Sequence, residues 1–101
     1  MAILYIQEYG SISRQADRLT MPVGQEPAAA DQAVDFTSGE TDSAAFNAET
    51  HLVRLESDTD CHLKFGSGAQ TATTSHMKMK ADQPEYFGVK PGHQLAVIAA
   101  A

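Results

Sequence analysis

Apolar and polar residues alternate most regularly in two runs near the middle of the chain. The first run is Leu-Val-Arg-Leu-Glu-Ser at residues 52–57, and the second is Cys-His-Leu-Lys-Phe-Gly at residues 61–66. A period of two places successive side chains on opposite faces of a β-strand, one buried and one in water. The polar, aspartate-rich residues between the runs indicate a turn. We therefore predict an antiparallel hairpin over residues 50–66, at the centre of an all-β sandwich.

Shorter alternating runs predict further strands on both sides of this hairpin. Residues 2–9 are apolar on both faces, so we expect this strand to be covered on both sides or to lie at a subunit contact. In residues 75–81, we expect Met77, Met79 and Ala81 to face the core and the intervening polar residues to face water. The remaining strands are predicted at residues 32–36, 85–89 and 93–99, with a polar loop at 37–43 and a Pro-Gly turn at 90–92.

The number and spacing of these runs predict the fold class. About eight short strands, separated by turn signals every eight to twelve residues or so, are typical of a sandwich or jelly roll. No long amphipathic helical pattern interrupts them. We expect a jelly-roll-like antiparallel β-sandwich that forms a single domain over residues 1–101.

Residues 10–31 differ from the rest because they have no sustained period and contain Pro22 and Pro27, which exclude a long helix. An irregular segment of this length is uncommon in a compact domain and is usually functional. One interpretation is a solvated loop with a short strand near residues 20–23, and the other is an arm that packs on a neighbouring subunit. The apolar residues of the segment keep the second interpretation open; they are Ile12, Leu19, Met21 and Val23.

Composition predicts a thin core. Hydrophobic residues make up 43% of the 101 residues, but many are alanine, and the chain has no Trp, three Tyr and four Phe. We therefore expect association with a partner to contribute to stability. No apolar run is long enough to cross a membrane, and the first residues lack the basic and apolar regions of a signal peptide, so we expect a cytosolic site of synthesis.

The formal net charge of −6 argues against direct binding to nucleic-acid phosphates. The acidic residues are concentrated in residues 32–60, whereas residues 61–101 have a small excess of lysine. Such asymmetry can orient copies of a protein against one another or against a partner.

The residues that could carry chemistry favour a protein without a reactive centre. The four histidines are single and far apart in the sequence, which does not match the close-spaced ligand pairs of zinc sites. Cys61 falls in a buried position of its strand and is expected to be a small apolar residue. Asp58 and Asp60 lack the further oxygen ligands of a calcium loop. We expect no catalytic residue, no metal and no cofactor.

Five segments carry a resemblance to a known class of protein. They are Val-Gly-Gln-Glu-Pro at 23–27, Ser-Ala-Ala-Phe-Asn-Ala-Glu-Thr-His-Leu-Val-Arg-Leu at 43–55, Cys-His-Leu-Lys-Phe-Gly at 61–66, Thr-Ala-Thr-Thr-Ser at 71–75 and Glu-Tyr-Phe-Gly-Val-Lys-Pro-Gly at 85–92. Together with the short N-terminal strand, they resemble small virion proteins encoded near the capsid genes of tailed bacteriophages. The chain is similar in particular to the jelly-roll cement, or decoration, proteins of the outer shell.

This resemblance implies a structural, non-enzymatic protein on the capsid exterior, assembled in the host cytoplasm. Its partners would be the major capsid protein, whose neighbouring subunits it would bridge, and further copies of itself in a homodimer or homotrimer. Direct contact with nucleic acid or membrane is not expected. We expect the interface to involve Tyr5 and the arm, at residues Ile12, Arg14, Arg18, Leu19, Met21 and Val23.

Two other functions fit the sequence less well. A carbohydrate- or receptor-binding sandwich on a virion fibre or tail would favour exposed aromatic platforms, yet Trp is absent and Tyr is scarce. A small cupin-like enzyme would share the Pro-Gly and His of residues 91–93. It would also need a His-x-His pair and a glutamate at defined spacing, which the sequence lacks.

Overall fold

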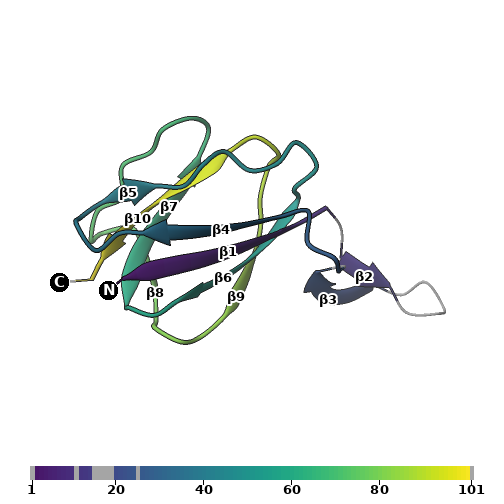
Figure 1. Cartoon of the computed structure of the whole chain (residues 1–101), viewed down its shortest axis with the longest axis horizontal. Helices are drawn as coiled ribbons and strands as arrows, with labels where there is room; N and C mark the ends of the chain where they lie inside the picture. Colours follow the sequence, from purple (N-terminus) through teal and green to yellow (C-terminus); the bar gives the residue numbers. More distant parts are fainter. Residues whose placement is uncertain (1, 11, 15–19, 25, 101) are drawn as a thin grey trace.

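A computed structural model describes residues 2–10, 12–14, 20–24 and 26–100, with the backbone alone described at 12–14 and 20–24. The described residues form two four-stranded antiparallel sheets and a separate two-stranded hairpin (Figure 1). The first sheet consists of β4 (Ala30–Asp35), β1 (Ile3–Tyr9), β6 (Leu52–Ser57) and β9 (Glu85–Gly88), in that order. The second consists of β5 (Thr41–Asp42), β10 (Gln94–Ala99), β7 (Cys61–Gly66) and β8 (Met77–Met79).

The chain mostly alternates between the two sheets. The connections from β4 to β5, β5 to β6, β6 to β7, β8 to β9 and β9 to β10 each pass from one sheet to the other. This is the connectivity expected of a double-sheet jelly roll. The predicted all-β sandwich is therefore confirmed.

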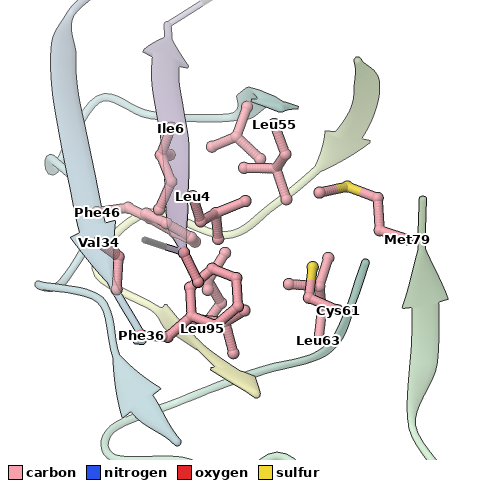
Figure 2. Close-up of a cluster of buried hydrophobic side chains, with 13 residues drawn as sticks. Leu4, Ile6, Val34, Phe36, Phe46, Leu55, Cys61, Leu63, Met79 and Leu95 are labelled. Atoms are coloured by element: carbon pink, nitrogen blue, oxygen red, sulfur yellow. The ribbon is translucent and has the colours of Figure 1, made fainter. Parts of the chain in front are cut away.

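Alternation along the strands builds the core between the sheets. Leu4 and Ile6 of β1 and Leu55 of β6 are fully buried on the inner face of the first sheet. Cys61 and Leu63 of β7 are buried against them from the second sheet, and Figure 2 shows the two groups pointing toward one another. Phe residues outside the strands close the core, as Phe36 and Phe46 do.

The predicted hairpin over residues 50–66 is wrong, because its two strands do not pair. β6 pairs with β1 and β9, whereas β7 pairs with β10 and β8 in the opposite sheet. The two strands and their buried faces were predicted correctly. The turn between them carries the chain across the core instead of along one sheet.

Three further predictions need correction. Met79 faces the core, but Met77 is 46% exposed, and β8 covers residues 77–79 only. The predicted polar loop at 37–43 contains the short strand β5. Residues 10–31 contain the predicted strand near Thr20 but also β2 and the first residues of β4. The predicted turn at residues 90–92 is confirmed, since the His93 amide donates to the Lys90 carbonyl at 3.2 Å and Gly92 has a φ of 79°.

The turn between β6 and β7 is hydrogen-bonded to residues near both ends of the chain. The Ile3 amide donates to a carboxylate oxygen of Asp58 at 2.8 Å, and the Asp58 amide donates to the Ile3 carbonyl at 3.2 Å. The Ala100 amide donates to the Asp60 carbonyl at 2.9 Å. The first and last strands are therefore tied to one turn, at the end of the molecule marked N and C in Figure 1.

The hairpin of β2 (Ile12–Arg14) and β3 (Thr20–Gly24) projects from the opposite end of the sandwich (Figure 1). We call this hairpin the arm. It leaves the sandwich after β1 and returns to β4, and the Ala29 amide donates to the Glu8 carbonyl at its base. With the arm, the molecule measures 46 × 26 × 21 Å.

A buried carboxylate, which the sequence analysis did not single out, fixes the loop before β6. Glu8 is 1% exposed, and its Oε1 accepts hydrogen bonds from the Asn47 amide at 2.7 Å and the Thr50 hydroxyl at 2.9 Å. Its Oε2 accepts one from the Gln32 side-chain amide at 2.8 Å. Three donors thus satisfy a charge that would otherwise be costly to bury.

Candidate interaction surface

All three tyrosines of the chain lie on the outer face of the β4–β1–β6–β9 sheet. Tyr5 and Tyr9 of β1 alternate with the buried residues of that strand, and Tyr86 of β9 alternates with the inward-facing Phe87. Tyr5 is 49% exposed and Tyr86 is 42% exposed. Pairing of β1, β6 and β9 brings these rings onto one surface, which we call the tyrosine face.

Arg54 of β6 lies in the middle of the tyrosine face, directly between Gln7 and Tyr86 in the strand register. Its guanidinium donates to the Gln7 side-chain oxygen at 3.3 Å and to Glu56 at 3.3 Å, the latter as an ion pair. These contacts hold a planar cation at a position directly opposite Tyr86 in the strand register, and Tyr5 is opposite the neighbouring Glu56. Tyrosine and arginine are among the residues enriched at protein–protein contacts.

Tyr9 connects the tyrosine face to the base of the arm. It is only 2% exposed, and its hydroxyl donates to a carboxylate oxygen of Glu26 at 2.8 Å, just beyond β3. Burial, the hydrogen bond to Glu26 and the charge of that carboxylate raise the pKa of Tyr9 to about 12. The phenol therefore stays protonated near neutral pH and keeps donating this hydrogen bond.

The structure places some of the expected interface residues and leaves others undescribed. Tyr5 is exposed on the tyrosine face. Ile12 and Arg14 lie in β2, and Met21 and Val23 lie in β3, but their side chains are outside the described part of the structure, as are Arg18 and Leu19 altogether. Sequence reasoning missed Arg54 and Tyr86, because no local signal shows that β6 and β9 are neighbours of β1.

The described residues show no arrangement typical of a metal site or a reactive thiol. No group of three or more His, Cys, Asp or Glu side chains among them could hold a metal ion. Cys61 is fully buried, and burial raises the pKa of its thiol. The expectation that Cys61 is a buried core residue is confirmed. No helix in the described ranges is long and apolar enough to span a membrane.

The histidines are not as separate in space as they are in the sequence. His62 and His76 meet on the second sheet, where a ring nitrogen of His62 lies 3.0 Å from the His76 carbonyl oxygen. His51 and His93 line the same cavity at the end of the sandwich near the arm. Spacing along the sequence does not show either proximity, and neither pair belongs to a possible metal-holding group among the described residues.

No protein-family model, curated protein or solved structure matches the chain.

Proposed function

We propose that this chain is a structural virion protein that binds the outer surface of a phage capsid and cements neighbouring major capsid subunits. The observation that carries the proposal is the arm, which projects from one end of a compact sandwich (Figure 1). A projecting hairpin and exposed tyrosines on one sheet face offer two places for neighbouring protein subunits to bind.

The tyrosine face has the properties of a protein contact rather than of ordinary surface. Tyr5 and Tyr86 provide large apolar area with few rotatable bonds, so ordering them on binding costs little entropy. Arg54 is already held by Gln7 and Glu56, which reduces the cost of fixing its long side chain. Exposed tyrosines that flank an arginine match the residue types enriched at the centre of protein interfaces.

Self-association would add to this binding on a shell. Copies in a homodimer or homotrimer would each contact the capsid, and several linked contacts bind far more strongly than one. The acidic exterior, with 13 acidic and 7 basic residues, suits a site on the outside of a shell, away from nucleic acid.

The first test mixes the purified protein with empty capsids that lack it and measures binding by sedimentation. We expect saturable binding and raised heat resistance of the shells. The double variant Tyr5→Ser, Tyr86→Ser should bind at least about tenfold more weakly, because truncation of interface aromatics commonly costs more than 1 kcal/mol each. Met77→Ser is the matched control, since Met77 is similarly exposed but lies on the other sheet.

A second variant replaces residues 12–24 with a short Gly/Ser linker. We expect it to fold and to lose most capsid binding. Unchanged capsid affinity in both the tyrosine variant and the arm variant would refute the proposal.

The tyrosine face also favours one alternative, a carbohydrate- or receptor-binding module of a virion fibre or tail. Aromatic rings on a sheet face are a common platform for sugars. A glycan array distinguishes the two functions. Saturable glycan binding that depends on Tyr5 and Tyr86, without capsid binding, would support the alternative.

A further inference from the structure

A cavity of about 450 Å³ opens at the end of the sandwich from which the arm projects. It lies between the start of β6, the end of β7 and the turn from β9 to β10. Its apolar lining includes Phe46, Phe65 and Val89, and the two phenyl rings lie 6.5 Å apart between centroids. The volume is within the range of small-molecule binding sites, about 300–1,000 Å³.

Three residues with basic side chains also line this cavity: His51, Lys90 and His93. The turn at residues 90–93 fixes the relative position of Lys90 and His93. The backbone of His51 is also fixed, because its amide donates to the Tyr9 carbonyl and its carbonyl accepts from the Val89 amide.

These basic groups have no counter-charge at the cavity. Within the described part of the chain, no group accepts a hydrogen bond or forms an ion pair with the Lys90 ammonium or with the His51 or His93 ring. None of the described lining residues is acidic, although the whole chain has a net charge of −6. An apolar cavity with unpartnered cationic and donor groups is complementary to an anion with an apolar body.

We infer that this cavity is a binding site for an aliphatic or aromatic carboxylate. The apolar body would pack against Phe46, Phe65 and Val89, and the carboxylate would accept hydrogen bonds from Lys90 and the histidines. A free organic acid or the last residue of a protein chain can present this chemistry. The inference does not depend on capsid binding, and either can fail without the other.

The test is an NMR titration of the full-length protein with hexanoate and 4-phenylbutyrate. We expect both acids to shift the resonances of residues 46, 51, 65 and 89–93. Hexan-1-ol and hexylamine match hexanoate in apolar length but not in charge. Hexanoate should bind about threefold to fivefold more tightly than the alcohol, the effect of a partly exposed ion pair, and the amine should bind most weakly.

Two variants and one control locate the site. Lys90→Gln should weaken hexanoate about threefold and leave hexan-1-ol unchanged. Lys78→Gln removes the same charge from β8 and should change neither affinity. Val89→Phe should fill the cavity and weaken both ligands, and a melting curve for each variant verifies folding.

Peptides distinguish the sources of the carboxylate. If the C-terminus of a protein chain can supply the carboxylate, a short peptide that ends in leucine with a free C-terminus should bind more tightly than the same peptide with a C-terminal amide. Binding of the free acids but not of the peptide would assign the site to small molecules. Equal affinities for hexanoate, hexan-1-ol and hexylamine, or shifts confined to other residues, would overturn the inference.

Discussion

Met77 and Met79 occupy the same short strand and the same side of it, yet 46% of one and 1% of the other is exposed. Alternation assigns both to the inner face. An inward-facing residue is buried only where the opposite sheet lies over it. Alternation does not show how far the opposite sheet extends over an edge strand such as β8. Figure 2 shows Met79 directed into the core beside Cys61.

This contrast gives a matched pair of variants. Met79→Ala should lower the free energy of unfolding by about 2–5 kcal/mol, because it leaves a cavity in the core. Met77→Ala should change it by less than about 0.5 kcal/mol, as is usual for an exposed residue. Urea denaturation followed by circular dichroism measures both. Equal losses from the two variants would contradict the burial described here.

Glu8 is a second residue whose structural role cannot be read from the neighbouring sequence. Its carboxylate accepts hydrogen bonds from β4 and from the loop before β6. In a sequence, a glutamate in a strand of alternating pattern looks like an outward-facing residue, and only the tertiary structure supplies its three donors.

Glu8→Gln should therefore destabilise the protein by about 1–3 kcal/mol. The amide has one acceptor oxygen in place of two, and its NH₂ group faces a donor, so a buried polar group is left without a partner. Glu85→Gln makes the same chemical change at an exposed position of β9 and serves as the control. Denaturant midpoints that agree for the two variants would show that the buried carboxylate contributes nothing.

At the scale of elements, the sequence predicted the strands and their buried faces better than it predicted which strands pair with one another. The runs at 52–57 and 61–66 are strands with the expected buried residues, and together they occupy central positions in the two sheets. Local alternation is the same whether a turn joins paired strands or crosses the core. The choice depends on β1 and β10, which lie far away in the sequence, and for the same reason the tyrosine face could not be predicted.

The β6–β7 turn depends on ionised aspartates. Hydrogen bonding from the Ile3 amide holds the pKa of Asp58 below its usual value of 3.8, and the Ala81 amide does the same for Asp60. A carboxyl group whose pKa is lower in the folded protein than in the unfolded chain stabilises the fold at pH values above the unfolded-chain pKa. This stabilisation is lost as the pH falls through the pKa of the folded protein. The turn should therefore loosen below about pH 4.

The variant Asp58→Asn, Asp60→Asn tests this dependence. Asparagine retains an acceptor oxygen but cannot be protonated in this range, so the melting temperature should fall less steeply between pH 5 and pH 2 than in the unchanged protein. Asp31→Asn, on β4, is the control for loss of one charge. Parallel curves for all three proteins would exclude a role for these two carboxylates.

For the whole molecule, the described hydrogen bonds between the sandwich and the arm lie at the base of the arm. The described core residues belong to the sandwich strands and to positions 2, 36 and 46, and the described bonds at the base of the arm are made by residues 26 and 29. Sequence patterns predicted a strand near Thr20, but the pairing of β2 with β3 and the direction in which this hairpin projects depend on the fold.

Replacement of residues 12–24 with a Gly/Ser linker should thus change the free energy of unfolding by less than about 1 kcal/mol, since a shorter loop costs little to close. Calorimetry or urea denaturation measures the change, with the Tyr9–Glu26 hydrogen bond left in place. A cooperative transition lost altogether would show that the arm is needed for folding.

The attachment of both chain ends to the β6–β7 turn has a practical consequence. A fluorescent protein or an enzyme fused to either terminus would emerge at the end of the sandwich opposite the arm. On a particle that the arm contacts, both fusions would therefore carry their cargo on the side of the sandwich away from the arm.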